Sequence, residues 1–159
     1  MPSRVKPGLG ELLRYVSELV DQGAEAQYRA LNLTYRARYT PLLRAISAGA
    51  ESVTDITART HLTQGAISQT LGLMADDGIV ARHALEDGRK SGFHLTAQGK
   101  KLLKTLEPHW QVTFAAIQAL EQEIGHPLLR ALEDTARALE QKDFAARLEA
   151  ARQNETCHV

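Results

Sequence analysis

The stretch of sequence that decides the fold is Glu86-Asp87-Gly88-Arg89-Lys90-Ser91-Gly92-Phe93-His94-Leu95-Thr96-Ala97-Gln98-Gly99-Lys100. Two basic residues, Arg89 and Lys90, stand between glycines at its centre. The segments 79–85 and 92–95 on either side have the composition of short strands. The pattern predicts a two-stranded hairpin with a positively charged tip, followed directly by a helix.

A second pattern lies upstream, in residues 58–71, which read Ala-Arg-Thr-His-Leu-Thr-Gln-Gly-Ala-Ile-Ser-Gln-Thr-Leu. Apolar side chains at Leu62 and Ile67 have the spacing expected of two helices joined by a tight turn. Thr63 is a favourable N-cap for the second helix. We place the turn at His61, where positive φ is expected, because histidine is among the non-glycine residues that adopt it.

Helical periodicity continues on both sides of these patterns. Further helices are predicted over 9–31, from Pro41 to Gly49, from a cap at Thr54, from a cap at Thr96 to about Ile124 with a kink at Pro108, over 128–139, and briefly around Phe144 and Leu148 before a frayed tail after Ala151. The expected fold class is mainly α with a small β-wing, in a single domain of residues 1–159. A winged helix-turn-helix over 38–104 is flanked by dimerisation helices over 8–35 and 105–151. The flanking apolar stripes exceed what a small winged helix can cover, which predicts a homodimer.

Charge is distributed unevenly along the chain. The 19 basic and 19 acidic residues cancel, yet residues 28–104 carry 11 basic and 6 acidic side chains. This excess of positive charge coincides with the winged helix and is the electrostatic pattern expected of a nucleic-acid-binding surface. Further basic residues precede the helix-turn-helix and are expected to reach phosphate, to satisfy helix ends or to line a pocket: Arg29, Arg36, Arg38 and Arg44.

Several classes of protein are disfavoured by the sequence. A single cysteine, Cys157, rules out a disulfide framework within one chain. No signal sequence or membrane-spanning run is recognisable, so we expect a cytoplasmic protein without membrane contact. No catalytic motif is present, and the six histidines show no close ligand spacing, so we expect no enzyme activity, no cofactor and no metal.

The motifs together resemble the MarR family of winged-helix transcriptional regulators. The wing signature of that family, Asp-x-Arg followed by Leu-Thr-x-x-Gly, is similar to Asp87-Gly88-Arg89 and Leu95-Thr96-Ala97-Gln98-Gly99. The segment 77–82, Asp-Gly-Ile-Val-Ala-Arg, is similar to the start of the family's wing. The resemblance implies a sequence-specific regulator of transcription, expected to be a dimeric repressor on a pseudo-palindromic double-stranded DNA operator. It also implies that Arg89 enters or lines the minor groove.

The residues expected to bind DNA belong to the second helix of the helix-turn-helix and to the wing: Thr63, Gln64, Gly65, Ala66, Ser68, Gln69, Arg82, Asp87, Arg89, Lys90 and Ser91. Glutamine can bond adenine bidentately, and a small side chain such as Ala66 can contact a thymine methyl group. Asp87 is expected to orient the hairpin or to pair with Arg89. The alternative is that the polar residues of this helix form an ordinary solvated surface that binds nothing.

Many proteins of this family bind small aromatic ligands, which implies release from DNA by such an effector. The candidate contacts are Tyr15, Tyr39, His109 and Trp110, although Trp110 lies on an apolar stripe and is also expected in the core. An alternative reading is a winged helix used only for dimerisation or protein contact. The basic block and the cationic hairpin tip favour DNA binding over this alternative. The sequence does not specify the operator, the effector, the direction of regulation or the role of Cys157.

Overall fold

The computed structural model describes residues 5–86 and 91–157. The chain forms two compact units, of which the first ends at Thr105 and the second begins at Leu106. One helix, α5 (Ala97–Ile124), continues across this boundary.

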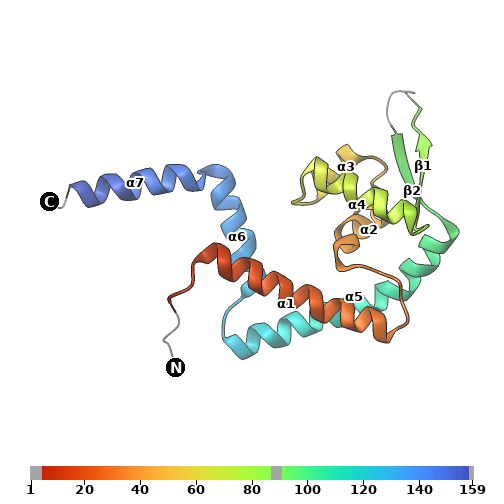
Figure 1. Ribbon diagram of the computed structural model, residues 1–159, viewed down its shortest axis with the longest axis horizontal. Helices are drawn as coiled ribbons and strands as arrows, with labels where there is room; N and C mark the ends of the chain where they lie inside the picture. The colour runs from red at the N-terminus through yellow and green to blue at the C-terminus, as the bar shows by residue number, and fades with distance from the viewer. Residues whose placement is uncertain (1–4, 87–90, 158–159) are drawn as a thin grey trace. The chain divides into compact units, whose positions relative to one another are not determined.

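The first unit contains the helix-turn-helix and the hairpin. Its elements in chain order are α1 (Leu9–Ala30), a short 3-10 helix η1 (Ala37–Tyr39), α2 (Thr40–Ser47), α3 (Val53–Arg59), α4 (Gln64–Asp76), β1 (Val80–Ala84), β2 (Ser91–Leu95) and the start of α5. The strands pair antiparallel, with Val80 opposite Leu95 and Ala84 opposite Ser91. Figure 1 shows the hairpin beside α3 and α4. The predicted class, mainly α with a small β-wing, is confirmed.

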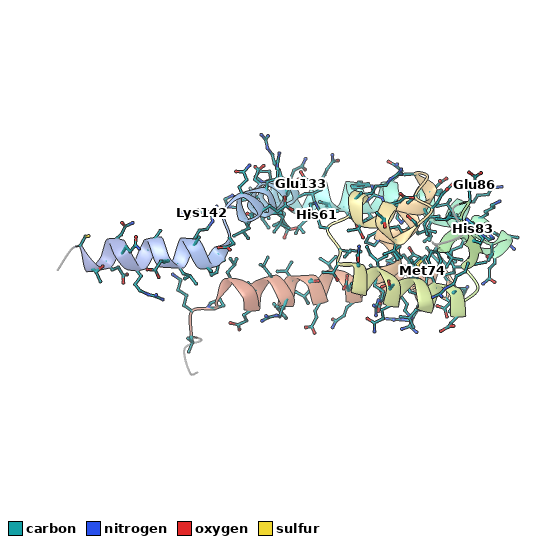
Figure 2. The ribbon with its side chains drawn as sticks, turned by 90° about the horizontal axis from the view of Figure 1, so that it is seen from above. His61, Met74, His83, Glu86, Glu133 and Lys142 are labelled. Carbon is teal, nitrogen blue, oxygen red and sulfur yellow. The ribbon has the colours of Figure 1, made fainter. Side chains whose placement is uncertain are left out.

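The core of the first unit forms between α2, α3, α4 and the hairpin. On α4, Ile67, Leu71 and Met74 are spaced by four and three residues and share one fully buried face. Met74 is marked on α4 in Figure 2. The other side chains without exposed surface include Tyr39, Leu42, Leu43 and Ile56. Burial of each leucine or isoleucine in this core stabilises the fold by about 1.5–3 kcal/mol.

Three tyrosines connect the end of α1 to this core. The rings of Tyr28 and Tyr35 meet edge to face with centroids 4.8 Å apart, and those of Tyr35 and Tyr39 do so at 5.7 Å. The Tyr35 hydroxyl lies 3.0 Å from the Thr40 hydroxyl. Edge-to-face pairs of this kind add to the stability gained from burial alone.

The Thr96 hydroxyl joins the ends of several elements. It donates to the carbonyl oxygen of Gly78 at 2.6 Å and accepts from the amide of Gly99 at 3.0 Å, which caps α5 as predicted. The Thr96 amide donates to the carbonyl of Ile79 at 3.1 Å. Gly78 has φ +76° and ends α4 in a left-handed turn that favours glycine. The Leu-Thr-x-x-Gly pattern thus fixes how α4, the hairpin and α5 meet.

Two local predictions are wrong. The cap of α3 is Ser52 and not Thr54: the Ser52 hydroxyl accepts from the Asp55 amide at 3.1 Å, and the Asp55 carboxylate accepts from the Glu51 amide at 2.9 Å. These two bonds satisfy two amides at the start of the helix, which Thr54 alone would not do. His61 does not have positive φ; among the described non-glycine residues that conformation belongs to Asn32, at +55°.

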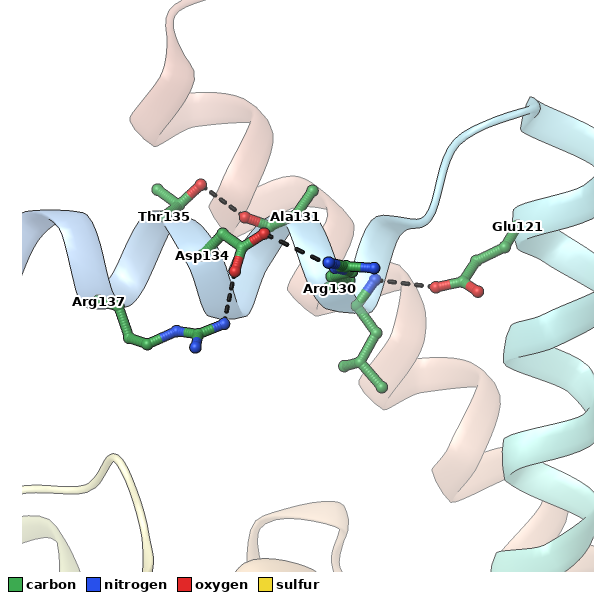
Figure 3. A network of polar contacts seen from close by, with 7 residues as sticks. Glu121, Arg130, Ala131, Asp134, Thr135 and Arg137 are labelled. Carbon is green, nitrogen blue, oxygen red and sulfur yellow. Dashed lines mark hydrogen bonds and ion pairs between the residues drawn. The ribbon is translucent and has the colours of Figure 1, made fainter.

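In the second unit, α5 ends at Ile124 and is followed by α6 (Leu128–Gln141) and α7 (Phe144–Thr156). Gly125, with φ +72°, makes the predicted break. A carboxylate oxygen of Glu121 accepts from the Leu129 amide at 2.9 Å, so α5 caps the start of α6. Figure 3 shows this contact and Asp134, which lies between Arg130 and Arg137 on α6.

The C-terminal part is more helical than predicted. We expected a short helical piece and a frayed tail after Ala151, but α7 continues to Thr156. Asp143 caps it by accepting from the Ala146 amide at 2.8 Å. Arg147 donates to the carbonyl of Ala138 at 2.8 Å and anchors α7 to the end of α6. None of the helices in the described ranges is long and apolar enough to cross a membrane.

Gly99 provides a test of the junction at Thr96. A Cβ at this position would overlap the carbonyl oxygen of Ile79, a backbone atom that cannot turn aside. We predict that Gly99→Ala lowers the free energy of unfolding by about 1–3 kcal/mol, the usual cost of overpacking. Gly72→Ala is the matched control, because a Cβ there meets nothing within 4 Å. It should be neutral or stabilise α4 by up to about 1 kcal/mol. Urea denaturation of both variants measures the difference, and equal effects would contradict the proposed close approach.

Candidate nucleic-acid interface

The first turns of α4 form an exposed surface that carries no charge. The Thr63 hydroxyl caps the helix by accepting from the Ala66 amide at 3.2 Å, as predicted. Ala66 is half-buried, and four predicted contact residues are exposed on this surface: Gln64, Gly65, Ser68 and Gln69. No charged residue occurs in the sequence of α4 before Asp76. Exposed faces of helices normally carry charged side chains, so an exposed face of amide and hydroxyl groups is distinctive.

Two hydrogen bonds hold α4 in place behind this face. Arg38 donates from Nη2 to the Thr70 hydroxyl at 3.1 Å, so at least one of its nitrogen atoms is used within the fold. At the other end of the helix, the Tyr39 hydroxyl donates to a carboxylate oxygen of Asp77 at 2.6 Å. Burial and this contact with Asp77 raise the pKa of Tyr39 to about 12, which keeps the hydroxyl protonated at neutral pH. These bonds fix the orientation in which α4 presents its polar face.

The hairpin lies next to α4 and contributes one described basic residue, Arg82 of β1. Its side chain is exposed, and its guanidinium carbon lies 5.5 Å from the centre of the Phe93 ring on β2. This cation–π contact supports the hairpin and leaves the guanidinium at the surface. The predicted contacts Asp87, Arg89 and Lys90 lie outside the described residues. Ser91 is the first residue of β2, and the structure describes its backbone but not its side chain.

The four predicted ligand contacts occupy different environments. Tyr15 is 56% exposed on α1, whereas Tyr39 has no exposed surface and offers none to a ligand in this conformation. His109 and Trp110 are half-buried on α5. Among the described residues, the indole N–H of Trp110 is a buried donor without a hydrogen-bond acceptor.

One cleft of the first unit lies between α2 and the helix-turn-helix turn and has a volume of about 460 Å³. Basic side chains on its wall include Arg44 and Arg59, and the latter donates to the carbonyl of Ala48 at 2.6 Å. None of the four predicted ligand contacts lines this cleft. The Arg59 bond satisfies a carbonyl at the end of α2, a structural role that sequence reasoning did not assign.

Sequence reasoning also missed a pair of histidines on the hairpin. Nδ1 of His83 on β1 lies 2.8 Å from Nδ1 of His94 on β2, and their ring centroids are 4.9 Å apart. The two residues are eleven positions apart in the chain, so linear spacing gave no signal. The strand register brings them together, because His83 stands opposite Gly92 and next to His94 on the same face.

No family model matches the sequence, and no curated protein matches it. Solved structures do match. The transcriptional regulator MosR of M. tuberculosis, solved with DNA, has a TM-score of 0.70 at 21% identity, over 85% of this chain and 98% of that one. A MarR family transcriptional regulator from Silicibacter pomeroyi gives 0.57 at 24% identity, over 89% and 98%. BpsR of Bordetella bronchiseptica, described with regulation of its DNA binding by 6-hydroxynicotinic acid, gives 0.60 at 21% identity, over 84% and 99%.

These matches cover most of the present chain and nearly all of each solved chain. The protein therefore has the winged-helix fold found in MarR-family regulators, as the motifs in its sequence indicated. In this fold, α3 and α4 correspond to the helix-turn-helix, and β1 and β2 to the wing.

The bond between Tyr39 and Asp77 generates a stability prediction. Tyr39→Phe keeps the buried ring but leaves the carboxylate without its donor, which should lower the free energy of unfolding by about 1.5–3 kcal/mol. Tyr15→Phe is the matched control, because the Tyr15 side chain is mostly exposed. Its effect should stay within about 0.5 kcal/mol. Chemical denaturation at pH 7 compares the two, and a similarly small effect for Tyr39→Phe would contradict a stabilising role for this bond.

Proposed function

We propose that the protein is a sequence-specific DNA-binding regulator of transcription and that α4 is its recognition helix. The observation that carries the proposal is the exposed, uncharged face of α4, on which Gln64 and Gln69 present amide side chains. Base edges in the major groove present hydrogen-bond donors and acceptors that amide side chains match. Phosphate, by contrast, is bound mostly by basic side chains.

The distribution of charge supports this division of roles. Residues 28–104 carry five more basic than acidic side chains, although α4 contributes none of the basic ones. Basic residues around a neutral reading helix supply the attraction to phosphate that positions a protein on DNA without specifying sequence. We assign part of this role to Arg82 and to the predicted wing residues Arg89 and Lys90. The fold is shared with MosR, which was solved with DNA.

The proposed regulator acts as a homodimer. Exposed apolar residues recur along α1 at helical spacing and are 43–61% exposed: Leu9, Leu12, Leu13, Val16, Leu19 and Val20. In the second unit, α6 also exposes Leu129, Leu132 and Leu139. An apolar stripe of this length is unfavourable in water and is covered most simply by a second copy. Two copies would set two recognition helices about 34–36 Å apart on one face of DNA.

Repression by occlusion of a promoter, relieved by a small aromatic effector, is the mode of action that we propose. The buried, unpaired N–H of Trp110 supports an effector, because such a donor costs about 1–3 kcal/mol until an acceptor is supplied. The effect of 6-hydroxynicotinic acid on the structurally similar BpsR provides a first compound to test. The predicted cytoplasmic location is part of the same proposal.

Selection from a random duplex library by the purified protein tests DNA recognition. We expect a pseudo-palindrome with half-sites one helical turn apart, bound specifically at both low and moderate salt. Arg89→Ala should weaken binding to this operator by about 1–3 kcal/mol and alter preference at its edges. The control is Arg130→Ala, since Arg130 is an exposed residue of α6. If no sequence is enriched and binding disappears at moderate salt, only phosphate attraction remains and a protein-contact module is favoured.

Trp110 is the single tryptophan of the chain, so its fluorescence reports on the proposed effector site. Titration with 6-hydroxynicotinic acid and related aromatic acids should change its emission saturably for at least one compound. That compound should release the wild-type protein from its operator, and Trp110→Phe should bind the operator but resist release. The absence of any saturable change across the series would contradict effector binding at Trp110 and leave the DNA-binding proposal intact.

A further inference from the structure

We infer that His83 and His94 form a metal-binding pair on the hairpin, suited to a divalent transition-metal ion that prefers tetragonal coordination, such as Ni²⁺ or Cu²⁺. The inference does not depend on DNA binding. It rests on the geometry of the two imidazoles, on the register that holds them, and on their access to solvent. Figure 2 marks His83 on the hairpin.

The two Nδ1 atoms lie at a distance that one metal ion can span. Imidazole nitrogens bind transition metals at about 2.0–2.1 Å. Two such bonds at a right angle place the nitrogens about 2.8–3.0 Å apart, whereas a tetrahedral angle places them about 3.3–3.4 Å apart. Nδ1 of His83 and Nδ1 of His94 are separated by 2.8 Å. Because 2.8 Å is also the length of the hydrogen bond that joins the rings, this distance shows that both nitrogens can reach one ion. The preference for Cu²⁺ or Ni²⁺ follows from the order of metal affinities at imidazole sites, which rises to Cu²⁺.

The strand register keeps the two histidines together without the metal. His83 stands opposite Gly92, and a Cβ at Gly92 would lie 2.6 Å from Nε2 of His83. Glycine therefore provides the space in which the His83 ring lies, and from there the ring reaches His94, two residues along β2. Binding replaces the hydrogen bond between the rings: the proton on Nδ1 of one ring moves to Nε2 of that ring, and each ring turns about its Cβ–Cγ bond, a soft torsion, until both Nδ1 lone pairs point at one ion.

The surroundings of the pair suit an open site. His94 is exposed and His83 half-buried, so water can complete the coordination shell. Within the described ranges, no cluster of three or more histidine, cysteine or acidic side chains is arranged to hold a metal. A site of two histidines and water ligands would bind a metal ion reversibly, and its affinity for Cu²⁺ would exceed its affinity for Zn²⁺. The two rings otherwise form a solvent-exposed hydrogen bond, in which one nitrogen donates and the other accepts.

Titration calorimetry of the untagged, chelator-treated protein with Ni²⁺ tests the inference, because Ni²⁺ does not oxidise the thiol of Cys157. We expect one site per chain. His83→Gln and His94→Gln should each weaken binding at least about tenfold, since even loss of a residue that only supports a ligand costs 10–100-fold. The matched control is His126→Gln, an exposed histidine of the second unit, which should retain wild-type affinity. Thermal unfolding followed by circular dichroism verifies that each variant is folded.

A second measurement on the wild-type protein makes the test independent of the variants. Substoichiometric Cu²⁺ should broaden the amide NMR signals of residues 80–84 and 92–95 before all others. The electron paramagnetic resonance spectrum should show coupling to two nitrogen atoms. The inference is overturned if Ni²⁺ does not bind, if both glutamine variants bind it as tightly as the wild type, or if Cu²⁺ broadens another part of the chain first.

Discussion

The Thr96 hydroxyl donates to the carbonyl of Gly78 and accepts from the amide of Gly99, and these two bonds join the end of α4, the end of the hairpin and the start of α5. Gly78 ends α4, Thr96 follows β2, and Gly99 lies in the first turn of α5. One side chain therefore connects the proposed recognition helix, the hairpin and the long helix that leads to the second unit. The close approach of Gly99 to Ile79 leaves no space for a larger residue.

The packing of α4 then determines which of its side chains form the proposed DNA-binding face. On α4, Ile67, Leu71 and Met74 are buried. Arg38 and Tyr39 bond to residues on and just after the helix. With its position fixed in this way, α4 turns Gln64, Ser68 and Gln69 to solvent. A rigid helix with a neutral polar face is suited to reading base edges, because side chains held in place lose less entropy on binding.

The features that could be predicted from the sequence are those encoded by local patterns. The N-cap at Thr63, the buried face of α4 and the cap at Thr96 each depend on residues within a few positions, and the structure shows all three. The predicted cap at Thr54 was wrong because the Ser52 hydroxyl accepts from the Asp55 amide and the Asp55 carboxylate accepts from the Glu51 amide, so the helix begins earlier. The histidine pair and the unpaired Trp110 could not be predicted, because each depends on tertiary placement. For His83 and His94, that placement is the register of two strands eleven residues apart.

Base preference within the selected half-site measures most directly whether α4 reads DNA. The selection is repeated with Gln69→Ala and Ser68→Ala, with Gln122→Ala of the second unit as the control. We predict that each α4 variant loses discrimination at one or two adjacent base pairs of each half-site, at a cost of about 1–3 kcal/mol per position, while Gln122→Ala retains the wild-type preference. If both α4 variants select the same half-site as the wild type with equal affinity, α4 is not the recognition helix.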